Sequence, residues 1–223
     1  MKVMILAAGR GERMGRLTKN CPKPLLKVAG RSLIEHHILA LKQQGFDDFV
    51  INIAYLGDQI KALLGSGERW GVRIEYSDEG GQALETGGGI LNALPLLGEQ
   101  PFLLVNADVW TDFPYASLKK QAAKGVHLVL VKNPPHHKEG DFGLLNGKAQ
   151  LEASERYTYS GIGVFNAAIF TPQMEGAFPL APLIRQLIAH DQVSAQLYQG
   201  EWVDVGTPER LANLQLKLQS AKF

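Results

Sequence analysis

Residues 3–14 read Val3-Met4-Ile5-Leu6-Ala7-Ala8-Gly9-Arg10-Gly11-Glu12-Arg13-Met14, an apolar run that becomes glycine-rich and basic. The apolar part is typical of a buried parallel strand. Five cationic residues and one acid lie between positions 10 and 23. Glycines let backbone N–H groups approach an anion, and arginine side chains pair with phosphate oxygens. A strand, a glycine-rich turn and this local charge together predict a binding site for a polyphosphate.

Other phosphate-binding motifs fit the stretch less well. The sequence contains no Walker A pattern. Gly9 and Gly11 match two glycines of a Rossmann dinucleotide motif, but the third, Gly15, comes one position late. Pro22 and Pro24 also interrupt the helix that this motif requires. A solvated basic loop is the remaining alternative, although a connection of this length rarely lacks a function.

The composition is that of a soluble globular protein. The chain has 223 residues, of which 45% are hydrophobic and 20% charged, enough for one α/β domain with a core. A net charge of +1 gives no general affinity for nucleic acid. Cys21 is the only cysteine, which excludes an intramolecular disulfide and favours a reducing cytoplasm. No segment is apolar over the length that a membrane span needs.

Strand and helix patterns alternate through the first half of the chain. Apolar runs predict strands at 49–53, 72–76, 102–105 and 126–131, and helical patterns occupy 33–44, 59–64 and 86–97. Thr86 is the expected N-cap of the third helix. This alternation predicts βαβ units, and therefore a three-layer α/β fold with a mostly parallel, Rossmann-like sheet.

The second half of the chain shows a different pattern of predicted elements. A hairpin is expected over 142–153, with Asn146-Gly147 at its turn. Further strands are expected at 157–165 and 193–198, and helices at 182–190 and 208–218. We expect a small antiparallel layer over the sheet, within one domain that spans residues 1–223.

Asp108 directly follows the predicted strand 102–105. Ligands of open α/β sheets bind beyond the carboxyl ends of the strands. A carboxylate at that position, facing a phosphate site, is suited to hold Mg²⁺. The alternative is an aspartate that only caps the following turn.

Two segments together resemble the signature of the sugar-1-phosphate nucleotidyltransferases: Leu6 to Met14 and Pro22-Lys23-Pro24-Leu25. The resemblance implies a nucleotidyltransferase core with a nucleotide-binding half at about 1–110 and a sugar-binding half at about 111–223. It implies Arg13, Lys23 and Asp108 as catalytic residues. It also implies that the triphosphate is bound by Ala8, Gly9, Gly11, Glu12, Arg13 and Lys23.

The segment Trp202 to Pro208 resembles the W-x-D-[IV]-G-T-P motif of the same family. The resemblance implies that Asp204 is the second metal-binding carboxylate, so that Asp108 and Asp204 hold Mg²⁺ together. An alternative is that Asp204 caps the last helix. Two carboxylates without a metal repel each other. We therefore expect the exchange of Asp108 for asparagine to leave stability unchanged or slightly raised.

Residues 82–89 resemble the region of the family that reads the base, which implies that Gln82, Thr86 and Gly87 bind the nucleotide. Consecutive glycines at a helix start expose backbone N–H groups, which suits a base or ribose lying against them. Glu85 departs from the family, because glycine is usual there. Gln82 can form paired hydrogen bonds with a pyrimidine edge, which favours UTP.

The resemblance is weaker on the sugar side. It implies sugar-phosphate contacts from Asn106, Gly143, Glu152, Ser154 and Ser160. Ala153-Ser154 replace the Lys and Pro of the family's E-K-P motif, which indicates either a sugar other than glucose or mannose or a different way of holding the sugar. An ordinary hairpin face is the alternative for Glu152 and Ser154. His136 and His137 are interpreted as solvated loop residues.

The implied activity is transfer of a uridylyl group from UTP to a sugar 1-phosphate, with release of pyrophosphate. Within the family, the sequence is most similar to the uridylyltransferases of cell-wall recycling. A mannose-1-phosphate guanylyltransferase is the second candidate. An inactive nucleotide-binding regulatory module and a Rossmann oxidoreductase are the alternatives of other classes. The expected protein has no nucleic acid or membrane partner, and its oligomeric state is open, a monomer included.

Overall fold

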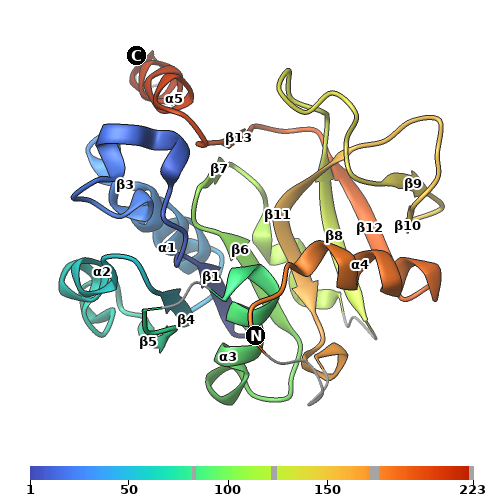
Figure 1. The fold of residues 1–223 in the computed structure, drawn as a ribbon, viewed down its shortest axis with the longest axis horizontal. Coiled ribbons are helices and arrows are strands. Elements are labelled where there is room, and N and C mark those ends of the chain that lie inside the picture. The colour runs from blue at the N-terminus through green and yellow to red at the C-terminus, as the bar shows by residue number, and fades with distance from the viewer. Residues whose placement is uncertain (82–83, 122–124, 171–175, 221–223) are drawn as a thin grey trace.

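The computed structural model describes residues 1–81, 84–121, 125–170 and 176–220. Its centre is a nine-stranded sheet with the order β5-β4-β1-β6-β11-β8-β12-β10-β9 (Figure 1). The strands are β1 Val3–Leu6, β4 Asp48–Ile53, β5 Arg73–Asp78, β6 Phe102–Asn106, β8 Val126–Val131, β9 Gly143–Leu145, β10 Lys148–Gln150, β11 Thr158–Phe165 and β12 Val193–Tyr198. Strands β10 and β11 run opposite to the other seven, so the sheet is mixed but mostly parallel.

Two short antiparallel sheets lie outside the main sheet. One pairs β2 (Lys27–Val28) with β3 (Arg31–Ser32), and the other pairs β7 (Val109–Thr111) with β13 (Trp202–Asp204). The second sheet joins the segment after β6 to a segment near the end of the sequence.

Helices form the outer two layers: α1 Leu33–Gln43 and α2 Gly57–Leu64 on one face of the sheet, and α3 Glu85–Leu97 and α4 Leu180–Ala189 on the other. The last helix, α5 Pro208–Ser220, packs against the first loop instead. Successive side chains of a strand point to opposite faces of a sheet. Val3 and Ile5 accordingly belong to the core beneath α1 and α2, whereas Met4 belongs to the core beneath α3 and α4. The three layers expected from the sequence are present.

The hairpin expected at 142–153 forms as β9 and β10, with Asn146 and Gly147 at positive φ in its turn. Both strands extend the edge of the main sheet through the pairing of β10 with β12. The hairpin is therefore a continuation of the central sheet, because β12 leaves an edge that needs a partner. The small antiparallel sheets of the fold are the separate pairs β2–β3 and β7–β13.

The helix starts are determined by different local contacts. Ser32 and Glu35 form a reciprocal capping box at the start of α1. The N-cap of α3 is Leu84, not Thr86 as expected. The hydroxyl oxygen of Thr86 instead accepts a hydrogen bond of 2.9 Å from the backbone N–H of Leu180. Thr86 thus ties α3 to the start of α4.

A third apolar cluster joins the first loop to the last helix. It contains Met14 of the 3₁₀ segment Glu12–Thr18, together with Val28, Val205 and Leu214. Gln215 on α5 accepts a 2.7 Å hydrogen bond from the backbone N–H of Ala29. Figure 1 shows α5 beside the first loop, at the end of the sheet where β1 and β6 end. Burial of this cluster fixes both ends of the sequence around one site.

None of the helices in the described part of the chain combines the length and apolar character that crossing a bilayer requires.

His37 makes the stability of the fold depend on pH. Its imidazole is buried in α1, where desolvation lowers the pKa of His37 to about 4. The unfolded chain has a histidine pKa of about 6.5 and so takes up this proton first. Stability is therefore complete above pH ~6.5 and falls as the pH drops toward 4, by up to about 3 kcal/mol.

Denaturant unfolding at pH 7 and pH 5 measures this loss. His37→Leu should make the difference between the two pH values smaller. An unchanged pH dependence in His37→Leu would show that His37 is not its source.

Candidate active site

A cavity of about 760 Å³ lies at the carboxyl ends of β1 and β6. The first loop, the start of α3 and the segment after β6 form its walls. The lining includes Ala8, Gly9, Arg10, Gly11, Glu12, Arg13, Lys23, Asn52, Glu79, Glu85, Thr86, Asn106, Asp108 and Gly206. The structure thus brings together, on one cavity, most of the residues predicted to bind the nucleotide.

The first loop is held in shape by contacts that need a glycine. Gly11 has φ +66°, and a Cβ there would lie 3.0 Å from side-chain carbons of both Lys23 and Thr18. The Thr18 hydroxyl donates a 2.9 Å hydrogen bond to the Gly11 carbonyl. Gly11 therefore allows Lys23 to pack under the loop with its amine at the cavity.

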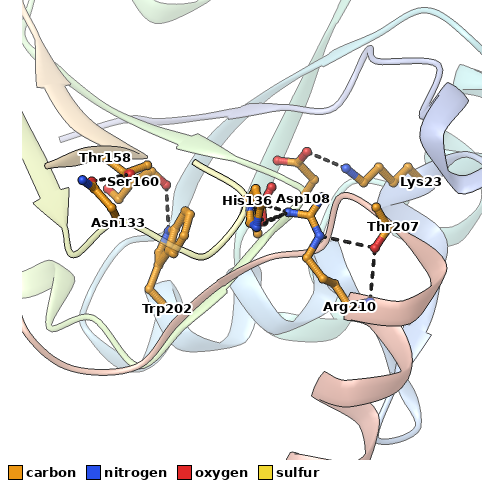
Figure 2. Close-up of polar contacts among 10 residues, drawn as sticks. Lys23, Asp108, Asn133, His136, Thr158, Ser160, Trp202, Thr207 and Arg210 are labelled. Atoms are coloured by element: carbon orange, nitrogen blue, oxygen red, sulfur yellow. Dashed lines mark hydrogen bonds and ion pairs between the residues drawn. The ribbon is translucent and has the colours of Figure 1, made fainter. Parts of the chain in front are cut away.

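Lys23 and Asp108 form an ion pair across the cavity wall. Lys23 Nζ lies 2.6 Å from Asp108 Oδ2, and the exposed fractions of the two side chains are 9% and 35%. Figure 2 shows the lysine reaching from its loop to the carboxylate. An ammonium group this buried needs a partner, and Asp108 supplies it.

Asp204 lies next to Asp108 through the small sheet of β7 and β13. Asp204 pairs in register with Val109, and the backbone N–H of Val205 donates a 2.7 Å hydrogen bond to the Asp108 carbonyl. Both aspartates line a second cavity of about 400 Å³, which Arg13 and Asn106 also line. The two carboxylates therefore converge on one region, on the side of the sheet that faces the first loop.

Asp204 also has two side-chain partners of its own. Its Oδ1 forms an ion pair with Arg210 on α5 and lies 3.2 Å from Nε2 of His136. His136 is an exposed loop residue, as expected, but its side chain also faces Asp204 and lines the second cavity, which the sequence did not predict. Arg210 was not identified from the sequence, since it lies outside the W-x-D-V-G-T-P motif.

The donor set fits Mg²⁺ but not a metal held by protein ligands alone. Among the residues that the structure describes, no group of three or more His, Cys, Asp or Glu side chains could hold a metal. Mg²⁺ commonly binds one or two carboxylates and completes its shell with phosphate oxygens and water. Asp108 and Asp204, beside cavities that the cationic first loop lines, match that requirement.

The base-reading region agrees only in part with the expectation. Gln82 lies outside the described residues. Thr86 and Glu85 line the 760 Å³ cavity. Glu85 has φ +58°, a left-handed conformation that glycine adopts without strain.

Gly87 is not placed in the cavity wall. A Cβ on Gly87 would lie 2.2 Å from a ring carbon of Phe178, and its N–H donates a 2.9 Å hydrogen bond to the Phe178 carbonyl. The missing side chain therefore serves close packing, and the N–H that was expected to face the nucleotide is already engaged.

Asn52 and Glu79 were missed by the sequence reasoning. Asn52 accepts a 2.7 Å hydrogen bond from the Ala7 N–H and donates one of 2.6 Å to Glu79. The other carboxylate oxygen of Glu79 accepts from the Leu84 N–H at 3.0 Å. This buried chain of hydrogen bonds fixes the first loop relative to the start of α3. The available signal was a polar Asn52 within the apolar strand β4.

The predicted sugar residues are separated by the structure. Asn106 and Ser160 line the second cavity. Ser160, however, is 1% exposed and donates a 2.7 Å hydrogen bond to the Val129 carbonyl, so its hydroxyl is used within the sheet. Its backbone carbonyl accepts from the indole N–H of Trp202 at 2.9 Å (Figure 2).

Gly143, Glu152 and Ser154 line neither of these two cavities. Gly143 is buried, and a Cβ there would lie 2.3 Å from the Cβ of Ala153. Glu152 is exposed, and Ser154 lines a separate cavity of about 780 Å³ together with residues such as Arg156. The hairpin therefore does not bring these three residues to the paired carboxylates.

A β-bulge shapes the second cavity instead. The pairing of β11 with β8 shifts between Tyr159 and Ile162. Gly161 in this bulge has φ +77°, and a Cβ there would lie 2.6 Å from the Asn106 side-chain nitrogen. Bulges often redirect side chains next to active sites. Here the bulge lets Asn106 pack against β11 at the edge of the cavity.

Comparison with known proteins agrees with this geometry. Residues 2–221 match the model of the nucleotidyl transferase family. The N-acetylmuramate alpha-1-phosphate uridylyltransferase of Neisseria meningitidis serogroup B is 47% identical, over 96% of this chain and 97% of the relative. The protein of the same name from Caulobacter vibrioides is 35% identical, over 98% and 97%.

More distant relatives have other substrates in their names. The mannose-1-phosphate guanylyltransferase catalytic subunit beta of Xenopus tropicalis is 28% identical, over all of this chain and 66% of the relative. The solved structure of an inositol-1-phosphate CTP transferase from T. maritima matches with a TM-score of 0.77 at 16% identity, over 98% of this chain and 96% of that one. The structural match shows a shared fold. With the family match over nearly its whole length, the chain belongs to the nucleotidyl transferase family.

Proposed function

We propose that the protein transfers a uridylyl group from UTP to N-acetylmuramate α-1-phosphate, giving the UDP-sugar and pyrophosphate. The observation that carries the proposal is the convergence of Asp108 and Asp204 beside a cavity walled by the glycine-rich loop. The choice of sugar and base follows the two relatives of this name, which the chain matches over nearly its full length. We further propose that the reaction needs Mg²⁺, takes place in the cytoplasm and belongs to peptidoglycan recycling.

In the proposed reaction, an oxygen of the sugar phosphate attacks the α-phosphorus of UTP. The new P–O bond forms as the bond between the α-phosphorus and the bridging oxygen to the β-phosphorus breaks, and pyrophosphate leaves with that electron pair. Such a displacement needs positioning and charge neutralisation rather than a covalent enzyme intermediate. Arg13 and Lys23 would neutralise phosphate oxygens, and Gly9 and Gly11 would let the triphosphate approach the backbone. Bound Mg²⁺ would supply further charge neutralisation at the α-phosphate.

The proposal is tested by measuring pyrophosphate release for pairs of nucleotide and sugar phosphate. UTP, CTP and GTP are each combined with the 1-phosphates of N-acetylmuramate, N-acetylglucosamine and mannose. We expect the highest kcat/KM with UTP and N-acetylmuramate 1-phosphate. Preference for GTP and mannose 1-phosphate would favour the second candidate, and no release with any pair would favour a regulatory module.

We expect UTP to exceed CTP by at least about 10²-fold in kcat/KM. Cytosine presents an amino donor where uracil presents a carbonyl acceptor, and a site built to hydrogen-bond one leaves buried polar groups unpaired with the other. The same assay with Gln82→Ala should bring the two rates closer. Equal rates with UTP and CTP in the wild type would remove Gln82 from base recognition.

A further inference from the structure

Arg210 on α5 connects the last helix to the paired carboxylates. Its Nη1 forms the ion pair with Asp204 and lies 2.7 Å from Nε2 of His136. Its Nε donates a 3.3 Å hydrogen bond to the Thr207 hydroxyl, which holds the guanidinium against the turn before α5 (Figure 2). The arginine and aspartate side chains are 18% and 21% exposed, so the pair is largely shielded from water.

Arg210 also lies beside a second guanidinium. A Cβ built on Gly206 would lie 2.4 Å from Arg210 Nη2 and 3.2 Å from Arg13 Nη1. Both guanidiniums therefore lie beside Gly206. Two positive groups this close repel each other, and an anion between them relieves the repulsion. Asp204 is the carboxylate that pairs with Arg210 in this structure.

The same carboxylate is the proposed ligand of Mg²⁺. A metal and an arginine would compete for Asp204, because the guanidinium already pairs with one of its two carboxylate oxygens. If Mg²⁺ takes Asp204, the guanidinium loses its counter-ion while remaining tethered to Thr207. Arg210 then lies beside Arg13, which lines both cavities, and beside His136, which lines the second one. Phosphate oxygens are the acceptors that a planar guanidinium binds best.

We propose that Arg210 has two successive partners. It neutralises Asp204 in the free protein, and it binds the phosphate of the sugar 1-phosphate once Mg²⁺ occupies Asp204. The inference rests on the proposed function for the identity of that phosphate. We assign this phosphate to the sugar 1-phosphate because Asp204 and His136, the two side chains that Arg210 contacts, both line the 400 Å³ cavity. The ion pair thus leaves neither Arg210 nor Asp204 without a counter-ion in the free protein. When a metal binds Asp204, Arg210 becomes free to bind phosphate.

The first test measures Mn²⁺ binding to the nucleotide-free protein by calorimetry. Arg210→Gln removes the competing cation, so Mn²⁺ should bind about five-fold more tightly than in the wild type. Lys217→Gln removes a charge from the same helix, at a lysine that pairs with Glu201 instead, and should leave the affinity unchanged. Arg210→Lys keeps the charge and should stay near the wild type. Unchanged or weaker Mn²⁺ binding in Arg210→Gln would overturn the proposal.

The second test is the kinetics of pyrophosphate release. Arg210→Gln should raise KM for the sugar 1-phosphate by about ten-fold or more and leave KM for UTP near the wild-type value. Arg210→Lys should recover part of this loss, because a lysine lacks the planar fork. A purely structural arginine would weaken metal binding and turnover together. An unchanged KM for the sugar phosphate would also overturn the proposal.

Failure of the proposal for Arg210 can be distinguished from failure of the proposed function. Mn²⁺ binding to the free protein does not depend on which nucleotide or sugar reacts. If Arg210→Gln tightens Mn²⁺ binding but no substrate pair releases pyrophosphate, the proposed function fails and the competition for Asp204 remains.

Discussion

Exchange of Asp108 for asparagine is expected to reduce pyrophosphate release to background. An amide has no charge with which to hold Mg²⁺ or to orient Lys23, so two sources of charge neutralisation at the reacting phosphate are lost together. Loss of a single electrostatic donor already costs about 10²–10³ in kcat. The measurement is kcat at saturating UTP and sugar 1-phosphate over a range of Mg²⁺ concentrations. Turnover near the wild type in Asp108→Asn would exclude the proposed metal site.

The structure changes the expected effect of this variant on stability. Repulsion between two carboxylates predicts a neutral or stabilising exchange. In the structure, however, Lys23 is buried against Asp108, so the asparagine leaves an ammonium group without its counter-ion. We now expect Asp108→Asn to lower the free energy of unfolding, on the order of 1 kcal/mol because Asp108 remains partly exposed.

A double-mutant cycle tests this reversal. Lys23→Met combined with Asp108→Asn should be less destabilised than the sum of the two single variants, since neither charge is then left unpaired. Denaturant unfolding at one pH supplies all four values. Additive effects would mean that the ion pair does not contribute to stability.

Exchange of Lys23 for alanine is the second change with a large expected effect. Its ammonium group lies beside Asp108 at the wall of the 760 Å³ cavity, where phosphate charge would develop during the displacement. Removing this cation should lower kcat by at least about 10²-fold. The measurement is pyrophosphate release under saturating substrates.

Lys19→Ala provides the matched control. Lys19 is an exposed cation of the same loop and does not line the 760 Å³ cavity. Its variant should keep kcat within a few-fold of the wild type at equal ionic strength, since exposed charges are well screened. Equal losses of kcat in both variants would indicate that turnover depends on the total positive charge of the loop and not on Lys23 in particular. Near-normal turnover in Lys23→Ala would remove Lys23 from the catalytic residues.

Contiguous features of the chain were predictable from the sequence. The first loop, the strand ends and the hairpin turn depend on neighbouring residues, because glycine, proline and apolar alternation act over a few positions. The position of Asp108 after a buried strand was likewise sufficient to place it at the carboxyl edge of the sheet. The family match confirmed the resemblance that these motifs carried.

The roles of individual glycines and polar groups were harder to predict. Gly87 and Gly143 carry motifs that resemble ligand-binding segments, yet each packs against a side chain from another part of the chain. A missing side chain can make room for a ligand or for a neighbour. Sequence alone does not distinguish these, because the answer depends on what lies opposite. Ser160 illustrates the same point with a hydroxyl used inside the sheet.

The sequence by itself determined the chemistry of the site: a glycine-rich cationic loop, an aspartate after a buried strand and a second aspartate before the last helix. Only the tertiary structure decided how these charges balance. Lys23 meets Asp108, while Arg210 and His136 meet Asp204, across separations that no local pattern specifies. The physical reason is that ion pairing depends on distance in space and on desolvation. Both quantities are set by the packing of the first loop against α5 and by the pairing of β7 with β13.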